Sequence, residues 1–299
     1  MNNDFKLDFV GIGAPRSGTT WISRCLDEHP QICFSKTKEF HFFMFDKRYQ
    51  RGLNYLKKQF THCQPNTIKG EWSVDYLYSE EVAQRIKKDF PDTKILICLR
   101  DPVERAHNHF LFQKQNSNIG HHHNFKDIIL PNDKYKYLER GFYAKYIKKY
   151  LEFFPRENIY IMFFEDIKEK PLELIQSLYQ FLGVDKNFIP SNLNKKSDYR
   201  DPDKFYSIFI QNIINKIIYL YKKSFLRKPL QILQFKKIMR FFAQLNTRNP
   251  EQKFGRLKTV DDSQNIIDKS LEKELKEKLL NDIEELEKMT GRNLTSWKN

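Results

Sequence analysis

One short segment near the N-terminus constrains the fold of this chain more than any other. It runs from Gly11 to Trp21 and reads GIGAPRSGTTW. The apolar residues 9–12 lead into it, and a helix-like run continues from it as far as Leu26. We predict a strand, a tight turn and the N-terminus of a helix, an arrangement that binds anions through backbone N–H groups and the helix dipole.

The predicted anion-binding turn differs from a Walker A loop at one position. Gly13 and Gly18 have the G-x-x-x-x-G spacing of that loop, but the next residue is Thr19 where the loop requires Lys. Arg16 supplies a cation within the turn instead, and its planar guanidinium offers several hydrogen-bond donors. The residues that we assign to this anion site are Arg16, Ser17, Gly18, Thr19, Thr20 and Trp21.

A second anion site is predicted after the apolar run Lys94–Leu99, which is typical of a buried strand. Asp101 suits the N-cap of a following helix, and Pro102 suits its first position. Arg100 therefore lies at the carboxyl end of a strand, where ligands of open α/β sheets bind. Together with Asn108, two turns into the helix, it would hold a second anionic group.

In both segments the chain resembles the sulfotransferases that use 3′-phosphoadenosine 5′-phosphosulfate as donor and release adenosine 3′,5′-bisphosphate. In that family a loop similar to residues 14–21 binds the 5′-phosphosulfate, and a segment similar to residues 100–110 binds the 3′-phosphate through an Arg and a Ser. Asn108 stands in place of that Ser and can still donate a hydrogen bond. Further segments that resemble motifs of the heparan-sulfate-type and bacterial branch, in the same order, are 36–43 (KTKEFHFF), 70–77 (GEWSVDYL) and 286–297 (LEKMTGRNLTSW).

The resemblance implies roles for residues around the predicted donor site. Glu39 matches the general base of the heparan-sulfate-type enzymes, and Arg16 would neutralise the leaving phosphate. His41 would contact the acceptor or serve as an alternative base, and in a strand it would share the face of Glu39. Trp72 replaces a Lys of that branch and could stack on a sugar or an aromatic acceptor. The residues assigned to acceptor binding are His41, Trp72 and Asp75, and no metal ion is implied.

Strand-like and helix-like runs alternate along the chain, which predicts a parallel sheet covered by helices on both faces. We expect a P-loop-like α/β fold, a three-layer α/β/α sandwich, in a single domain of residues 1–299. The expected strands are 8–12, 32–34, 67–70, 94–99 and 158–163. The expected helices are 19–28, 79–88, 102–115, 142–153, 171–182 and 270–289.

Residues 204–248 interrupt this alternation and are strongly basic. They contain ten Lys and Arg residues and no Asp or Glu, in a chain with a net charge of +14. We favour a helical cap or insertion within the domain, with its Lys side chains exposed. The alternative is a basic amphipathic surface that meets an anionic lipid surface or an anionic acceptor. No nucleic-acid-binding motif accompanies the charge, so no nucleic-acid partner is expected.

The four cysteines fit no zinc-binding spacing. Cys25, Cys33 and Cys98 lie in apolar runs and are expected to be buried thiols. The first residues lack the basic segment and apolar core of a secretory signal, so a reducing cytoplasm is the expected location. The run His121–His123 is expected in an exposed loop rather than in a metal site.

Sulfuryl transfer to a hydroxyl or an amine is the function that these features favour. The acceptor classes left open are a carbohydrate, a lipid and a small natural product. A P-loop kinase is one alternative, but it would need a Lys after Gly18. A nonenzymatic nucleotide- or polyanion-binding module is the other alternative; loss of Glu39 or Arg16 would favour it, and both residues are present.

Overall fold

The structure is a computed structural model that describes residues 5–115, 119, 123–130, 133, 135–194 and 267–299. The basic segment 204–248, with its predicted helical cap, lies outside the described residues, as do His121 and His122. The chain divides into two compact units, of which the second comprises residues 111–124 and 198–267. Within the described part of that second unit, Lys114 Nζ donates to the carbonyl of His123 at 3.1 Å. The prediction of one domain stays a prediction.

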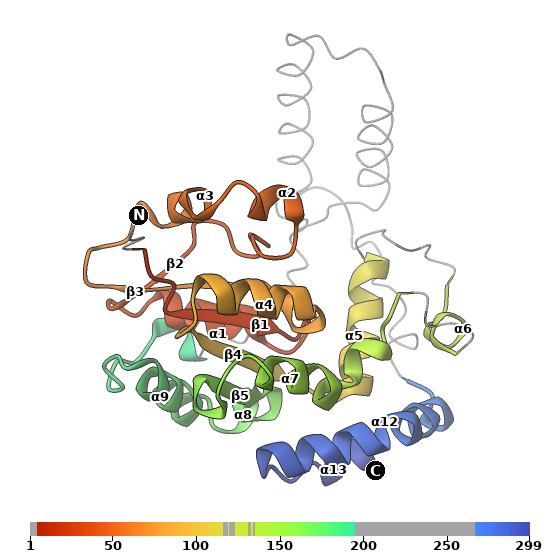
Figure 1. Cartoon of the computed structure of the whole chain (residues 1–299). Helices are drawn as coiled ribbons and strands as arrows, with labels where there is room; N and C mark the ends of the chain where they lie inside the picture. Colours follow the sequence, from red (N-terminus) through yellow and green to blue (C-terminus); the bar gives the residue numbers. More distant parts are fainter. Residues whose placement is uncertain (1–4, 116–118, 120–122, 131–132, 134, 195–266) are drawn as a thin grey trace, which may run out of the picture. The chain divides into compact units, whose positions relative to one another are not determined.

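The first unit is built on a five-stranded parallel sheet with the order β2-β3-β1-β4-β5 (Figure 1). All five strands begin and end within two residues of the predicted positions, because each is an apolar run bounded by polar residues or turns. The strands are β1 (Phe9–Gly13), β2 (Ile32–Phe34), β3 (Ile68–Trp72), β4 (Lys94–Leu99) and β5 (Ile159–Phe163).

Six helices match the six predicted from the sequence, again within two residues. They are α1 (Thr19–Asp27), α4 (Glu80–Asp89), α5 (Pro102–Gln115), α7 (Tyr143–Leu151), α9 (Pro171–Leu182) and α12 (Lys269–Thr290). The short helices were not predicted, since one turn carries too little periodicity to detect. They are α2 (Asp46–Tyr49), α3 (Leu53–Lys57), α6 (Phe125–Ile129), α8 (Phe164–Glu169) and α13 (Thr295–Lys298).

Helices cover both faces of the sheet, as expected for a three-layer sandwich. On one face α1 and α9 pack together over buried strand residues such as Phe9, Leu96 and Met162. On the other face α4 and α7 contact each other (Figure 1). Because both faces are buried, the strands read as continuous apolar runs rather than as alternating patterns.

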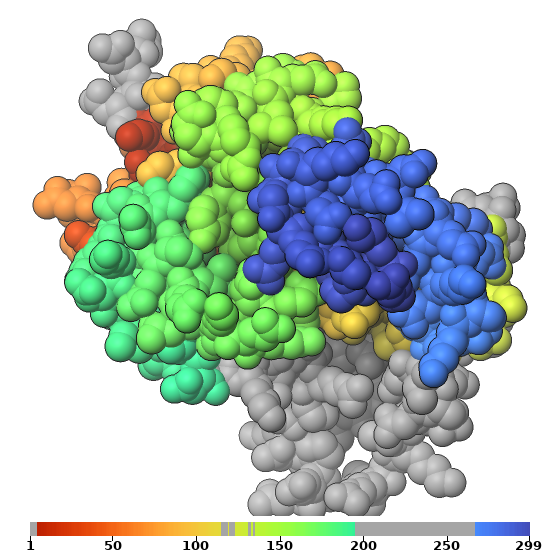
Figure 2. Space-filling view, turned by 90° about the horizontal axis from the view of Figure 1, so that it is seen from below, coloured from red at the N-terminus to blue at the C-terminus, as the bar shows by residue number. Residues whose placement is uncertain are grey.

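The C-terminal helix α12 stabilises α7 in an unusual way. The Asp282 carboxylate accepts hydrogen bonds from the backbone N–H groups of Ala144 and Lys145, both at 3.0 Å. It thereby satisfies donors that the first turn of α7 leaves without intrahelical partners. Figure 2 shows α12 and α13 (blue) against the green segments of this unit.

Residues 291–298, which follow α12, form hydrogen bonds with the residues directly after β5. Arg292 Nη2 donates to Asp166 Oδ1 at 2.7 Å, and Trp297 Nε1 donates to Glu165 Oε1 at 3.2 Å. The segment 286–297, which resembles a family motif, therefore binds residues 165–166 directly after β5. These contacts fix the first turn of α8, which directly follows β5.

The cysteine prediction is correct for two residues and wrong for a third. Cys25 and Cys98 are buried thiols, but Cys33 forms a disulfide with Cys63, 30 residues further along. The short helices after Phe45 return the chain to β2, where Lys36 N donates to the carbonyl of Gln59 at 3.0 Å. The prediction failed because the unpredicted α3 and the 3-10 turn after it bring Cys63 beside the strand.

Candidate active site

The carboxyl edge of the sheet gathers the predicted site residues. The chain leaves β1 toward β2 on one side and leaves β4 toward β5 on the other, so β1 and β4 flank the switch point at which ligands of such sheets bind. The turn after β1 is tied to β4 by two bonds. Ala14 N donates to the carbonyl of Cys98 at 2.7 Å, and Cys98 Sγ donates to the carbonyl of Ser17 at 2.8 Å.

The turn between β1 and α1 has the features of an anion site. Gly18 begins the helix with φ 85° and no side-chain cap, so the first backbone N–H groups of α1 remain available to a ligand. A Cβ at Gly18 would lie 2.4 Å from Ile167 Cδ1, so both conformation and space require glycine. The Ser17 hydroxyl is fully buried and has no hydrogen-bond partner among the described residues. A buried donor of this kind normally has a partner, and a bound oxyanion would supply one.

The side chain of Trp21 supports this turn from the core and does not face a ligand. It is 4% exposed, and its Nε1 donates to the carbonyl of Asn192 at 3.2 Å. The assignment of Trp21 to the donor site stays a prediction, although its indole ring is buried. The periodicity of α1 directs position 21 inward, together with Ile22 and Cys25.

Glu39 and His41 lie in a turn-rich segment after β2, not in a strand. Their φ angles are 58° and 51°, a conformation that few non-glycine residues adopt and that costs of order 1–3 kcal/mol each. Their side chains nevertheless meet, with His41 Nε2 3.9 Å from Glu39 Oε2. The Glu39 side chain is 41% exposed and that of His41 17%, so an acceptor can reach the carboxylate.

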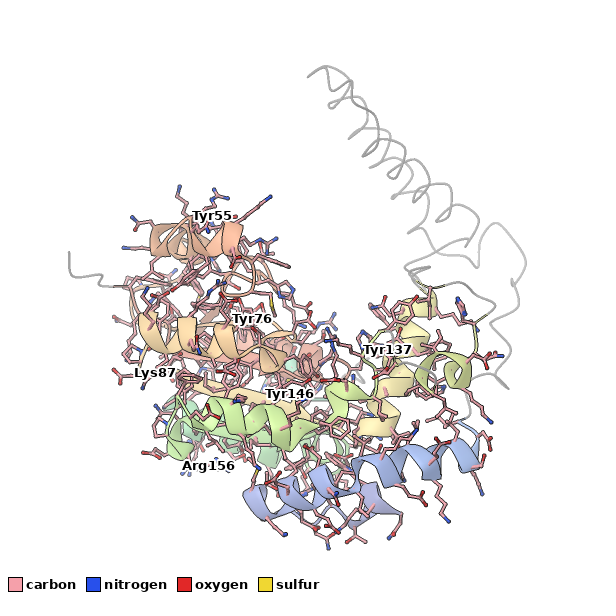
Figure 3. The ribbon with its side chains drawn as sticks, turned by 45° about the vertical axis from the view of Figure 1, so that its right-hand side comes forward. Tyr55, Tyr76, Lys87, Tyr137, Tyr146 and Arg156 are labelled. Atoms are coloured by element: carbon pink, nitrogen blue, oxygen red, sulfur yellow. A yellow bond between two sulfur atoms is a disulfide. The ribbon has the colours of Figure 1, made fainter. Side chains whose placement is uncertain are left out.

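The end of β3 holds this segment in place through three hydrogen bonds. Glu39 N donates to the carbonyl of Trp72 at 3.0 Å, and His41 N donates to Ser73 Oγ at 3.1 Å. Phe43 N donates to the buried hydroxyl of Tyr76, labelled in Figure 3, at 3.1 Å. The strained conformation is thus fixed by its neighbours, as strain at functional sites usually is.

Two residues of this region were missed by sequence reasoning. Glu71 is fully buried on β3, and burial raises its pKa to about 7, although nearby Tyr76 and Arg48 oppose the shift. Lys38 directly precedes the predicted base, and its Nζ donates to Thr20 Oγ1 at 2.8 Å. Lys38 could have been identified from the sequence by its position directly before Glu39 in segment 36–43, which resembles a family motif.

The predicted contact between Trp72 and an acceptor is wrong. Trp72 is 0% exposed and belongs to the core under α1 and α9. Its ring fills the space over Gly11, where a Cβ would lie 2.1 Å from Trp72 Cδ2. Because helices cover both faces of the sheet, position 72 of β3 is buried like its neighbour Glu71, so a residue that replaces the family Lys here becomes part of the core.

Asp75 lies near the surface at the carboxyl end of β3. Its Oδ1 is 3.0 Å from Arg140 Nη1, and both side chains are partly exposed. The acceptor role of Asp75 stays a prediction. The pair gives Asp75 a fixed position but reduces its negative charge.

The two residues predicted for the 3′-phosphate come together through Glu104. Arg100 Nε and Nη2 donate to Glu104 Oε2 at 3.0 and 2.8 Å, and the guanidinium lies 4.3 Å from the Phe164 ring centroid. Asn108 Nδ2 donates to the carbonyl of Glu104 at 2.7 Å. Asp101 caps the helix, as predicted, by accepting from the N–H groups of Val103 and Glu104. An anion at this place would share Arg100 with Glu104.

Cations from three elements surround His109 on α5. Burial, together with the charges of Arg105, Arg140 and Arg16, lowers the pKa of His109 to about 3. His109 is therefore neutral at physiological pH. The concentration of guanidinium groups beside the turn favours anionic ligands.

The described residues contain one group with metal-ligand atoms close together, Cys33, His62 and Cys63. The two sulfur atoms are joined in a disulfide and offer no thiolate, which is the form that binds metals. Within the described part of the chain, no helix is long and apolar enough to cross a membrane.

Comparison with known proteins agrees with this geometry. A family model described as the sulfotransferase domain matches residues 6–231. Heparan sulfate glucosamine 3-O-sulfotransferase 5 of Mus musculus is 29% identical over 216 residues, which cover 69% of this chain and 61% of that protein. The bifunctional heparan sulfate N-deacetylase/N-sulfotransferase 4 of Mus musculus is 27% identical over 204 residues, 62% of this chain and 23% of that protein.

The chain thus spans about three fifths of the first of these relatives and a smaller share of the second. The crystal structure of a sulfotransferase from Alicyclobacillus acidocaldarius has the same fold. Its TM-score is 0.68 at 22% identity, over 99% of this chain and 100% of that one. The chain therefore belongs to the sulfotransferases, the family of transferase enzymes that its motifs resemble.

Proposed function

We propose that this protein transfers a sulfuryl group from 3′-phosphoadenosine 5′-phosphosulfate to a hydroxyl or amine of a carbohydrate. The observation that carries the proposal is the meeting of two segments at one edge of the sheet. The Lys38–Thr20 hydrogen bond joins the anion-binding turn to the segment that presents Glu39 and His41. Among the acceptor classes, the heparan sulfate relatives favour a carbohydrate.

The residues present suit the donor. Arg16, the Ser17 hydroxyl and the backbone N–H groups at the start of α1 would bind its 5′-phosphosulfate. Arg100 and Asn108 would bind its 3′-phosphate, with Arg100 shared between the phosphate and Glu104. The buried and unpartnered Ser17 hydroxyl supports this assignment, since it needs an acceptor that the described protein does not supply.

In the proposed reaction Glu39 takes the proton of the attacking hydroxyl or amine. The acceptor atom bonds to sulfur while the bond from sulfur to the bridging phosphate oxygen breaks, and that electron pair stays on the departing adenosine 3′,5′-bisphosphate. Arg16 and the N-terminus of α1 stabilise the charge that develops there. His41 Nε2 lies 3.9 Å from Glu39 Oε2, beyond direct hydrogen-bond distance, so His41 would orient Glu39 or receive its proton only after a small movement or through a water molecule. A general base of this kind contributes about 10²–10⁴-fold to the rate.

The remaining parts of the proposal concern cofactors, partners and location. The reaction as proposed needs no metal ion, because fixed cations can stabilise the leaving group. We assign no nucleic-acid partner. The cytoplasmic location stays a prediction, and the Cys33–Cys63 disulfide, a type of bond that is rare in that compartment, does not favour it. The basic segment 204–248 remains a candidate for a cap, an acceptor surface or a contact with an anionic surface.

The experiment combines ligand stabilisation with transfer. Adenosine 3′,5′-bisphosphate should raise the melting temperature far more than ATP with Mg²⁺ does, because only a donor site matches both phosphates. Labelled donor should then deliver its sulfuryl group to saccharides of a heparan type. Equal stabilisation by ATP with Mg²⁺ would favour a kinase, and binding without transfer to any acceptor would favour a nonenzymatic module.

A further inference from the structure

Lys38 places its ammonium group beside the positive end of a helix. Its Nζ is 2.8 Å from the hydroxyl of Thr20, the second residue of α1. The N-terminus of a helix carries about half a positive charge and repels an ammonium group. Arg24 on the same helix adds to this repulsion, and the desolvating neighbours lower the pKa of Lys38 although the residue is exposed.

No carboxylate compensates this placement directly. Among the described residues Lys38 makes no ion pair, and the adjacent Glu39 carboxylate lies 3.9 Å from His41 instead. Attraction to the adjacent Glu39 opposes the fall in pKa; it is weaker than desolvation but stronger than the repulsion from Arg24. The Lys38 ammonium group and the positive end of α1 therefore form a local excess of positive charge, with no acidic residue in the first turn of the helix.

A second and independent observation indicates that a ligand removes this excess. The Ser17 hydroxyl in the same turn is fully buried without a hydrogen-bond partner among the described residues. Buried hydroxyl groups are nearly always satisfied. A single anionic group at the start of α1 would satisfy Ser17 and neutralise the cations around it.

We propose that Lys38 is a donor-binding residue whose ammonium contacts the 5′-phosphosulfate, with the Thr20 hydroxyl fixing its position. This inference rests on the proposed function. It gives residues 36–43 two tasks in one turn, since Lys38 would hold the group being transferred and Glu39 would activate its acceptor. The Glu39–Trp72 backbone bond positions both side chains at once.

Lys36 provides a matched control for the test. It is also exposed, and its Nζ also donates to a threonine hydroxyl, that of Thr61 at 2.6 Å. Thr61 follows a 3-10 turn at 58–60 and is not part of the anion-binding turn. Lys36→Met and Lys38→Met therefore remove the same charge and the same type of hydrogen bond, while methionine keeps most of the alkyl chain.

The experiment measures Kd by calorimetry for adenosine 3′,5′-bisphosphate and for adenosine 5′-phosphate. Lys38→Met should raise both values about tenfold or more, because both ligands carry the 5′-phosphate that a charge-assisted bond would hold. Lys36→Met should stay within about twofold of the wild type. Lys38→Arg, which keeps the charge, should restore most of the affinity. In donor kinetics Lys38→Met should raise KM and lower kcat, a combination that loss of surface charge alone does not produce.

Equal affinities of Lys38→Met and Lys36→Met would overturn the inference and make Lys38 an ordinary surface lysine. A loss confined to adenosine 3′,5′-bisphosphate would also overturn it, because Lys38 would then act at the 3′-phosphate. If Lys38→Met does not fold, Lys38→Gln and Lys38→Arg decide by the same comparison. Failure of the wild type to bind either nucleotide would instead contradict the proposed function.

Discussion

Glu39 combines solvent access with a backbone conformation that the protein has to enforce. Its carboxylate is partly exposed beside His41, and the carbonyl of Trp72 holds its N–H. This arrangement suits a group that must meet an acceptor in a fixed orientation, because a small misplacement of a base lowers its rate strongly. Neither the strain nor the partner follows from the sequence, which indicated only that Glu39 and His41 lie two residues apart.

Glu39→Gln should keep the affinity for adenosine 3′,5′-bisphosphate but lose most of the turnover, by about 10²–10⁴-fold. The amide preserves the size and hydrogen bonding of the side chain and removes its basicity. Calorimetry and single-turnover transfer assays measure the two effects separately. Near-full turnover with chemistry rate-limiting would transfer the role of base to His41.

Arg100→Ala should weaken binding of adenosine 3′,5′-bisphosphate much more than binding of adenosine 5′-phosphate. The guanidinium is oriented by Glu104 and Phe164, and a charge-assisted bond to a 3′-phosphate is worth about 1.5–3 kcal/mol. Calorimetry with the two ligands tests this, with Asn108→Ser as a variant expected to be mild. Equal losses for both ligands would show that Arg100 does not hold the 3′-phosphate.

Glu71 makes the free energy of unfolding depend on pH. Burial raises its pKa from 4.5 to about 7, so the folded protein holds this proton more tightly than the unfolded chain. The protonated Glu71 side chain therefore makes its full contribution to stability at low pH. This contribution is lost as the pH rises from about 4.5 through about 7. The loss amounts to about 3 kcal/mol at alkaline pH.

Glu71→Gln should remove this dependence, because the amide does not ionise. Urea unfolding at pH 5 and pH 8 gives the free energy of unfolding for both proteins. The difference between wild type and variant should shift by about 2.5 kcal/mol in favour of the variant at the higher pH. A constant difference across this range would mean that Glu71 is already ionised and paired in the folded state.

At the scale of elements, the sequence predicts the positions of strands and helices whose burial follows a regular pattern. It does not predict the path of segments without such a pattern. The five strands and six long helices follow from apolar runs and helical periodicity, so their positions were predictable. The segment 36–43 is a series of turns with two positive φ angles, and no hydrophobic period encodes such a path. The burial of Trp72 follows from its place on a strand covered by helices on both faces, whereas the family motif led to a different interpretation.

The disulfide between Cys33 and Cys63 closes the loop that contains residues 36–43. Reduction, or Cys63→Ser, should lower the free energy of unfolding by about 2–4 kcal/mol, because the unfolded chain regains the entropy of that loop. Urea unfolding with and without a dithiol reductant measures the effect. The double variant Cys33→Ser/Cys63→Ser serves as the control, since the reductant should not change its stability further. Unchanged wild-type stability under full reduction would show that short-range contacts alone hold the loop.

At the scale of the whole molecule, the charge of the chain is concentrated rather than dispersed. The net charge is +14, and residues 204–248 contain ten basic residues and no acidic one. Guanidinium groups also gather at the carboxyl edge around His109. The positive charge at the carboxyl edge of the sheet suits an anionic donor. The sequence alone could not assign the charge of residues 204–248 to a cap or to a surface that binds an anionic acceptor.

Charge reversal can separate a local acceptor surface from a general effect of net charge. Replacing Lys222, Lys223, Arg227 and Lys228 by Glu should raise the KM for an anionic saccharide while leaving the Kd for adenosine 3′,5′-bisphosphate unchanged. The matched control reverses four exposed lysines elsewhere, Lys57, Lys58, Lys88 and Lys186, and alters the net charge equally. If residues 204–248 form a local acceptor surface, the KM for the saccharide should rise much more for the first set than for the control set. This difference should persist at 0.15 M salt, where the Debye length is only about 8 Å. Similar rises for both sets, removed by salt, would indicate long-range steering alone. Wild-type KM values for both sets would make residues 204–248 a structural cap without a part in acceptor binding.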